Sequence, residues 1–586
     1  MFPSSMGGFP GQRPAAKPLV FLGVMVAITL VVGLGLVGLG RAATQASVVV
    51  DYTKPIGASN FTPGYSFDRC TFQADTAHCG RSAVDTAAAA SARQVLTDTG
   101  GLVADVPLYG SGGTNPQPNP GAFNDADLTA RLSIVKATGG TPMITLCCGP
   151  DWMAGGAVGA TGTTEGNFLL PQYYGQFAAL AARVAQAHPE VKRFLVWHDF
   201  VGLYATNGDF SRWDAAAYTT LYNQVYDAIK AVRPDAEVGG PAPPLVAWTL
   251  DQKIPYPSAV KAAGLQLDQR PLDALQYWLA HKHGTDFVAL SGGNSANNID
   301  AGSGGAYTAD GYGMCDVFGA ATGWLRSLDP TTYPGAPSLP LLWSGWNAYP
   351  AGGSAPAATM AQCLAATLAS GATTALVAGP EGLGSGPRSQ PESLWTGTVP
   401  GGGQPTDLQP VIQGLRTNFK PGTALYRTAT SGPVSALASA TTTMLINHTA
   451  SELSVRLDDQ SVTLGPAAVV FVAHTGDAAK APPPVPVAAP DATRPTSPTG
   501  FAPVVVADRQ IAVSWRPAED DVAVKGYRLY RDNQVLTNLA TTTFIDQTVT
   551  PGQAYTYGVE AFDSAGNNSD RVVFNVRAAP SAPLAP

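Results

Sequence analysis

The sequence is poor in charged residues. Asp, Glu, Lys and Arg make up 13% of its 586 residues, and the formal net charge is -8. Proteins that bind nucleic acids need a surface dense in Lys and Arg to neutralise phosphates. We therefore expect no nucleic-acid partner.

The residue spacings typical of metal sites are also absent. The chain has seven histidines, which show no ligand spacing, and its six cysteines form no Cys-x-x-Cys motif. We predict no metal site and no cofactor.

Cysteine is scarce, and six residues of this type fit an oxidising compartment. Cys70 and Cys79 flank a short polar loop, and we predict a disulfide between them. Adjacent Cys147 and Cys148 lie on an apolar strand, so we expect them to be buried as free or separately paired thiols. The sequence leaves open the pairing of Cys147, Cys148, Cys315 and Cys363.

One long apolar run occurs near the N-terminus. Residues 19–40 carry no charge and are about as long as the 20 residues that span a bilayer. Arg13 and Lys17 precede the run, which favours a cytoplasmic tail over residues 1–18 and an exported remainder. We predict a single-pass membrane anchor. The alternative is a secreted protein whose signal peptide is cleaved near Thr44-Gln45-Ala46.

Strands and helices alternate over residues 47–425, which indicates an α/β architecture with a parallel sheet. The unit at residues 194–239 shows this order, with a strand, a helix whose apolar residues recur every three or four positions, and another strand. Further helices are expected over residues 173–187 and 357–369. We predict a (β/α)8 TIM barrel. The alternative is a doubly wound open sheet, but no G-x-G-x-x-G follows an early strand.

The rest of the chain reads as β-structure interrupted by one spacer. Short alternating strands over residues 426–474 predict a small β-domain, and residues 475–500 form a proline-rich linker. The last segment, residues 501–578, contains the strands QIAVSW, GYRLYR and AYTYGVEA. These motifs and the D-x-A-G-N turn after them resemble a fibronectin type III domain.

Two strands run into tryptophans and polar or small residues, as expected where barrel strands end in a ligand cleft. They are FLVWHDFVG at residues 194–202 and LLWSGW at residues 341–346. Both resemble strand ends of clan A glycoside hydrolases, particularly the β-xylosidase and α-L-iduronidase families of the family 39 type. There strand four ends V-W-N-E and strand seven ends near S-E-W, and the two glutamates are the catalytic pair.

The resemblance implies a polysaccharide-acting O-glycosyl hydrolase with altered chemistry. His198 and Asp199 stand where Asn-Glu is expected, so Asp199 takes the acid/base position. Gly345 stands at the nucleophile position and has no side chain. Glu381 is the nearest substitute by topology, and Asp151 and Asp105 are the other acidic candidates. The resemblance also implies a β-sandwich beside the barrel, built partly by the strand that precedes it.

Aromatic rings stack on the apolar faces of sugars, so the tryptophans near the cleft are candidate ligand contacts. We place five residues in a carbohydrate site: Trp152, Trp197, His198, Trp343 and Trp346. The opposing interpretation makes these tryptophans core residues and leaves Asp199 to cap a loop or pair with Arg212.

These observations predict an exported glycoside-hydrolase-like protein that binds polysaccharide and is catalytically degenerate. One alternative is an active glycosidase that uses Asp199 with a relocated carboxylate such as Glu381. Another is a non-enzymatic adhesive or structural surface protein.

Overall fold

The computed structural model describes residues 45–580, except 68, 73–83, 109–115, 156–167, 201–202, 204–212, 251–255, 263, 298–305, 308–311, 349–355, 383–392, 475–493, 508, 521–523, 540 and 564–566. The predicted membrane anchor over residues 19–40 and most of the predicted linker lie outside this part of the chain. Among the described residues, no helix is both long and apolar enough to cross a bilayer.

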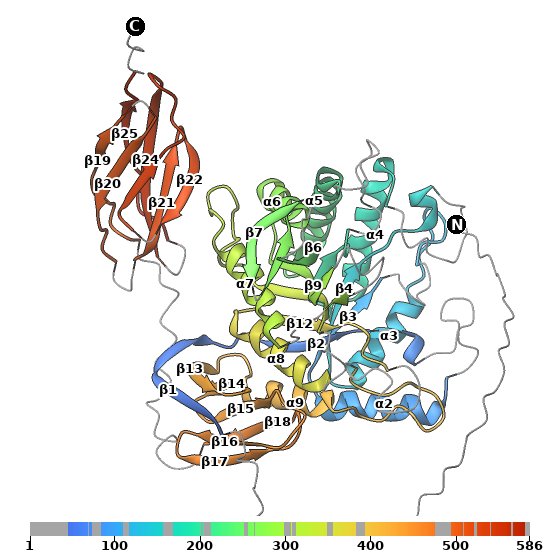
Figure 1. Ribbon diagram of the computed structural model, residues 1–586. Helices are drawn as coiled ribbons and strands as arrows, with labels where there is room; N and C mark the ends of the chain where they lie inside the picture. The colour runs from blue at the N-terminus through green and yellow to red at the C-terminus, as the bar shows by residue number, and fades with distance from the viewer. Residues whose placement is uncertain are drawn as a thin grey trace, which may run out of the picture. The chain divides into compact units, whose positions relative to one another are not determined.

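Eight strands form a closed parallel barrel (Figure 1). Each pairs in parallel with its two neighbours, and the β6–β9 and β12–β2 pairings complete the ring. This confirms the predicted barrel and excludes the open sheet. The strands are β2 (Thr62–Ser66), β3 (Val103–Pro107), β4 (Thr141–Leu146), β5 (Arg193–Val196), β6 (Glu237–Thr249), β9 (Phe287–Asn297), β11 (Leu341–Asn347) and β12 (Thr374–Val377).

Amphipathic helices surround the barrel (Figure 1). In α5 the predicted apolar positions, from Tyr218 to Ile229, are all buried, and the Asp214 carboxylate caps the helix by accepting from the Ala217 amide. The helices of the described part are α2 (Thr86–Thr99), α3 (Ala126–Ala137), α4 (Tyr174–Ala187), α5 (Ala215–Val232), α6 (Gln269–His281), α7 (Asp316–Arg326), α8 (Pro356–Ala369) and α9 (Leu408–Asn418).

Shorter strands and 3-10 turns lie in the connections between the barrel strands. β8 pairs antiparallel with β6 and β7, and β10 pairs with the end of β9. These elements are β7 (Pro257–Ala262), β8 (Leu265–Asp268), β10 (Ala306–Tyr307) and the 3-10 turns η1 (Arg69–Thr71), η2 (Asp151–Ala154), η3 (Pro171–Tyr173) and η5 (Gly313–Cys315).

Apolar side chains fill the inside of the barrel. The strands contribute a cluster made of Val103, Met143, Leu195, Ala242, Phe287, Ala289, Leu342 and Leu376, all buried. A barrel of eight strands is only wide enough for side chains to fill it. A ligand therefore has access to the barrel at its ends. Functional side chains are expected where the strands end.

A seven-stranded sheet combines the strand before the barrel with the strands after it (Figure 1). β1 pairs antiparallel with β13 and parallel with β16, as the family resemblance implied for the strand before the barrel. Phe471 of this sheet packs closely on Gly414 of α9. The strands are β1 (Gln45–Ala58), β13 (Ala424–Ser431), β14 (Val434–Ser439), β15 (Thr442–Asn447), β16 (Leu453–Leu457), β17 (Gln460–Leu464) and β18 (Val469–Ala473).

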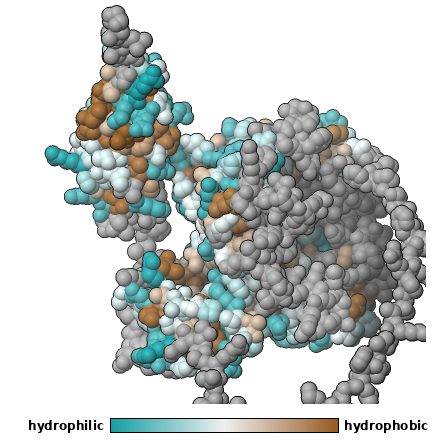
Figure 2. Space-filling model, viewed as in Figure 1, coloured by the Kyte–Doolittle hydropathy of each residue, from teal (hydrophilic) through white to brown (hydrophobic). Residues whose placement is uncertain are grey.

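The C-terminal segment forms a three-stranded and a four-stranded sheet around its own core. Trp515, Tyr527 and Tyr557 are buried between the sheets, and the arrangement fits the predicted fibronectin type III module. Apolar side chains also reach its surface (Figure 2). The strands are β19 (Thr499–Val506), β20 (Ile511–Arg516), β21 (Val524–Arg531), β22 (Gln534–Leu539), β23 (Thr543–Asp546), β24 (Ala554–Asp563) and β25 (Val572–Arg577).

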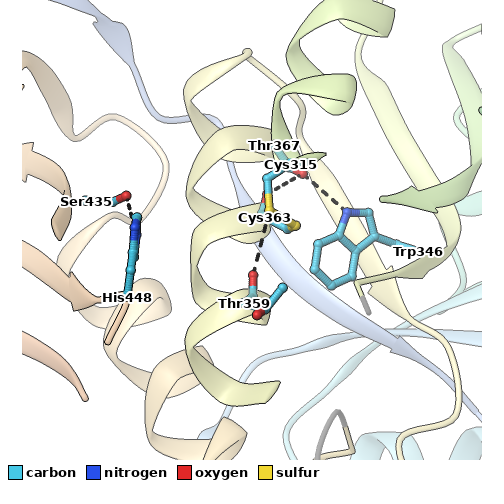
Figure 3. The surroundings of a disulfide bond; sticks show 7 residues. All are labelled: Cys315, Trp346, Thr359, Cys363, Thr367, Ser435 and His448. Carbon is cyan, nitrogen blue, oxygen red and sulfur yellow. Dashed lines mark hydrogen bonds between the residues drawn. A yellow bond between two sulfur atoms is a disulfide. The ribbon is translucent and has the colours of Figure 1, made fainter. Parts of the chain in front are cut away.

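A disulfide joins Cys315, at the end of η5, to Cys363 in the middle of α8 (Figure 3). Both residues are fully buried. The bond ties the start of α7 to the next helix of the barrel wall. Close by, His448, which directly follows β15, shares a hydrogen bond with Ser435 and stacks on Tyr312.

The other cysteines differ in part from the prediction. Cys147 and Cys148 are buried as expected, but they are bonded to each other, which corrects the expectation of free or separately paired thiols. Cys70 is disulfide-bonded. The predicted Cys70–Cys79 pair involves Cys79, which lies outside the described residues.

The Cys315–Cys363 bond should stabilise the barrel measurably. It closes a loop with a sequence separation of 48, for which chain entropy gives about 4 kcal/mol. We expect the Cys315→Ala/Cys363→Ala variant to lose about this much free energy of unfolding, measured by denaturant titration. Untreated wild type is the comparison, and an unchanged midpoint in the double variant contradicts the prediction.

Candidate functional site at the barrel mouth

The end of β5 positions His198 and Asp199 through a turn in a rarely used backbone conformation. Trp197, Asp199 and Phe200 have φ values of 65, 49 and 48 degrees, in the left-handed region that costs non-glycine residues of order 1–3 kcal/mol each. The buried ring of Phe200 packs edge-on against Tyr218, and the Asp199 amide donates to the Ala242 carbonyl at 3.0 Å. Packing therefore holds a strained turn in place, as is common at functional sites.

Asp199 and Gly345 come together at the mouth of the barrel. A Cβ atom placed on Gly345 would lie 4.0 Å from Oδ2 of Asp199 and 2.8 Å from Oγ of Ser291. Gly345 has a φ of 53 degrees, which favours glycine. The two positions singled out from the sequence thus face each other, but only one of them carries a carboxylate.

The Asp199 carboxylate is partly exposed and has capacity to bind a ligand. Its Oδ2 atom lies 3.4 Å from Nδ1 of His198, and both side chains are about 40% exposed, at 39% and 41%. Its Oδ1 atom is buried and has no hydrogen-bond partner among the described residues. Arg212, the other partner considered from the sequence, lies outside them.

Asp105 adds a second acidic group to the barrel interior near this site. It lies on β3 and accepts a hydrogen bond of 2.6 Å from the Thr145 hydroxyl. Burial raises the pKa of Asp105 to about 6, although the Thr145 hydrogen bond and the charge of His198 act to lower it. Asp105 can therefore exchange a proton near neutral pH.

Three predicted sugar-contacting tryptophans are core residues in the structure, which corrects that prediction. Trp197, Trp343 and Trp346 are each at most 1% exposed. Trp197 packs edge-on against Phe177 of α4, and Trp343 packs edge-on against Phe318 of α7. Residues along a barrel strand alternate between the interior and the surrounding helices, and these rings face the helices.

Trp346 is fixed by the helix that carries the disulfide. Its Nε1 atom donates to the Thr367 hydroxyl of α8 at 3.3 Å, beside the Cys315–Cys363 bond (Figure 3). Trp346 therefore braces the barrel wall and offers no free face to a sugar.

Trp152 lines a pocket separate from Asp199 and Gly345, and it is also largely buried. Its Nε1 atom donates to the Gln117 carbonyl at 2.9 Å, and its ring packs edge-on against Tyr173. The pocket that it lines is formed with Phe123, Arg183 and other residues, and includes neither Asp199 nor Gly345. This placement corrects its assignment to the same site.

Glu381 is occupied by structural hydrogen bonds and does not fit the role of a substitute nucleophile. It is buried, and one carboxylate oxygen accepts from the Thr71 hydroxyl at 2.6 Å. The other accepts from the amide and the hydroxyl of Thr398, at 2.6 and 2.8 Å. Glu381 thus ties together loops at the end of β12, and Asp151, in η2, is also buried.

A sulfur and nitrogen cluster lies in the same mouth, although the sequence predicted no metal site. Cys147 and Cys148 follow β4, and His198 follows β5, the strand paired beside it. One ligand atom from each of the three lies within 4.8 Å of the others. A search along the sequence missed this cluster because its members come from two strands. Following the order of the barrel strands could have found it.

No model of a protein family matches the chain. Among curated proteins, exoglucanase B of Cellulomonas fimi is 40% identical over 100 residues, which is 17% of this chain and 9% of that protein. Chitinase Chi52 of Paenibacillus xylanexedens is 35% identical over 80 residues, 14% of this chain and 15% of that protein. The chain therefore spans a small fraction of the length of these relatives.

Solved structures give more extended but distant likenesses. A monomeric β-xylosidase from Caulobacter crescentus has a TM-score of 0.44 at 12% identity, covering 91% of this chain and 97% of its own. The catalytic domain of the GH30 xylanase C from Talaromyces cellulolyticus also scores 0.44 at 12% identity, covering 73% and 100%. The structure of FN3tt scores 0.14 at 16% identity, covering 15% and 97%.

The raised pKa of Asp105 predicts how this residue affects stability with pH. Its folded pKa of about 6 exceeds the ordinary value of 3.8, so the folded state binds more protons between these values. Stability from this source is present below about pH 4 and is lost as pH rises through about 6. Relative to wild type, Asp105→Asn should gain about 2–3 kcal/mol between pH 4 and pH 7.

Denaturant unfolding of both proteins at the two pH values measures this difference. Asp459→Asn, at a fully exposed aspartate, is the matched control and should show no such gain. A similar pH dependence for Asp105→Asn and Asp459→Asn contradicts the prediction.

Proposed function

We propose that this protein binds polysaccharide at the mouth of its barrel and hydrolyses glycosidic bonds slowly or not at all. The observation that carries the proposal is the meeting of Asp199 with Gly345, where a Cβ atom would lie 4.0 Å from the carboxylate. Exoglucanase and chitinase, the names of the curated relatives, suggest polysaccharide as the class of ligand.

Retaining hydrolysis requires two carboxyl groups about 5–5.5 Å apart, one to attack the anomeric carbon and one to protonate the leaving oxygen. Asp199 occupies the acid/base position of the family pattern. Gly345 supplies no nucleophile, and the Ser291 hydroxyl lies beside the vacant position. Asp199 is also one methylene shorter than the glutamate of the family pattern. A ligand can therefore be held by His198, Asp199 and neighbouring backbone without rapid cleavage.

A second candidate function is an active inverting glycosidase that uses Asp105 with Asp199. The raised pKa of Asp105 favours it, because a general acid works best with a pKa near the working pH. Inverting enzymes place a water between two more widely separated carboxyl groups, so they need no residue at position 345. Asp105 replaces Glu381 here as the relocated carboxylate to test.

Restoring the family pattern should create activity. Gly345→Glu places a side chain at a φ of 53 degrees, which costs of order 1–3 kcal/mol. It must also be combined with Ser291→Ala, because the new Cβ would otherwise meet the Ser291 hydroxyl at 2.8 Å. Together with Asp199→Glu and His198→Asn, these changes should raise hydrolysis of aryl glycosides about 10²–10⁴-fold above wild type. Each single change should do little, because paired carboxyl groups act as a unit.

Calorimetry with xylo-, gluco- and chito-oligosaccharides tests binding by the wild type. His198→Ala should weaken binding, whereas His283→Ala, at an exposed histidine just before β9 and so at the other end of the barrel, should not. Absence of binding to every oligosaccharide contradicts the proposal. Robust wild-type hydrolysis that is lost in Asp105→Asn establishes the second candidate in its place.

We also propose that the protein is exported and held in a membrane by residues 19–40, with Arg41 onward outside the cytoplasm. The uncharged run and the preceding Arg13 and Lys17 support this orientation. Protease added to intact cells should remove the barrel and the C-terminal module. Complete protection of both, with a cytoplasmic protein as the control for intact cells, contradicts the proposal.

A further inference from the structure

Three side chains at the barrel mouth carry atoms that bind soft cations. The Sγ atoms of Cys147 and Cys148 and a ring nitrogen of His198 all lie within 4.8 Å of one another. The two cysteines are nearly fully buried, whereas His198 is 41% exposed, so the cluster has an open side.

The backbone fixes the positions of these residues. β4 and β5 pair in parallel with Leu146 opposite Val196, and the Trp197 amide donates to the Leu146 carbonyl at 3.2 Å. Cys147 directly follows Leu146, and His198 follows Val196 after Trp197. The cluster is therefore held by the barrel itself, which preorganises its ligand atoms.

The dimensions of the cluster fit a tetrahedral cation. Zinc binds sulfur at about 2.3 Å and imidazole nitrogen at about 2.0–2.1 Å, which places neighbouring ligand atoms roughly 3.5–3.8 Å apart. The observed limit of 4.8 Å leaves room for such a site once the two sulfur atoms are no longer bonded. The Asp199 carboxylate, 3.4 Å from Nδ1 of His198, adds negative charge beside it.

We infer that reduction of the Cys147–Cys148 disulfide creates a zinc-type cation site in the barrel mouth, with two thiolates and His198 as ligands. A phosphine reductant takes the oxygen of one water and becomes a phosphine oxide, and the two protons of that water go to the cysteine sulfurs. Cation binding then displaces these protons as the thiols become thiolates. The fourth position is open to water or to Asp199. This inference is independent of the proposed glycan binding.

The Cys315–Cys363 pair provides an internal comparison. Three potential metal ligands cluster at one place among the described residues. They are Cys147, Cys148 and His198. At the other pair, Cys315 Sγ lies 3.9 Å from the Thr359 carbonyl, and Thr367 hydrogen-bonds with Trp346 and with the Cys363 carbonyl (Figure 3). A cation bound after reduction should therefore depend on the mouth cysteines.

Cobalt titration of the full-length protein tests the inference, because thiolate-bound Co²⁺ absorbs in the near ultraviolet. Protein reduced by a phosphine under anaerobic conditions should bind one Co²⁺ per chain with these bands, and Zn²⁺ should displace it. The oxidised protein should show no bands. Failure of the reduced wild type to bind Co²⁺ overturns the inference.

Variants assign the site. Cys147→Ser, Cys148→Ser and His198→Ala should each weaken Co²⁺ binding at least about 100-fold, with folding checked by circular dichroism. Two controls should keep wild-type affinity: His283→Ala and Cys315→Ala/Cys363→Ala. Cobalt bands that survive in Cys147→Ser/Cys148→Ser but disappear in Cys315→Ala/Cys363→Ala place the cation at the other pair and overturn the inference.

Discussion

The pairing of β12 with β2 is the contact on which the rest of this structure depends. It closes the sheet into a ring, and because the strands are parallel, their carboxyl ends all emerge at one end of the barrel. Gly64 permits the closure, since a Cβ atom there would lie 2.5 Å from the Val103 carbonyl and 2.6 Å from the Leu376 side chain. Residues that are far apart in the sequence meet at the mouth for this reason.

Periodicity and strand order could be predicted from the sequence because burial imposes them directly. The helix from Tyr218 to Ile229 has its apolar residues on one face, and that face is buried in α5. The convergence of positions 199 and 345 followed from placing each at the carboxyl end of a parallel strand. Predicting these features requires only the apolar pattern within one segment and the rule that parallel barrel strands end on the same side.

The direction of individual side chains could not be read in the same way. Along β11, Leu342 faces the barrel interior and Trp343 faces α7. Regular alternation then breaks, because the pairing with β9 shifts register between Ser344 and Trp346. This irregularity turns Gly345 toward Asp199 and Trp346 toward α8. A sequence pattern that shows tryptophans at a strand end does not reveal such a shift. The buried tryptophans were therefore predicted to contact a sugar.

The role of Glu381 could not be predicted from the sequence, because it depends on hydrogen bonds between distant segments. Its carboxylate was the nearest acid to the vacant position by topology, but Thr71 and Thr398 occupy both of its oxygens. Neither threonine adjoins Glu381 in the sequence. Whether an acidic residue is free for chemistry depends on partners that only the folded chain brings to it.

The two proposals for the mouth are linked through the oxidation state of the Cys147–Cys148 pair. In the disulfide form the pair is neutral, and Asp105, Asp199 and His198 are ionisable groups of the described part of the mouth. An uncharged ligand such as a sugar can then bind by hydrogen bonds alone. In the reduced form, two thiolates beside Asp199 would leave several negative charges in a partly buried space, which is costly unless protons or a cation compensate them. The proposed sugar ligand therefore matches the oxidised form, and the proposed cation matches the reduced form.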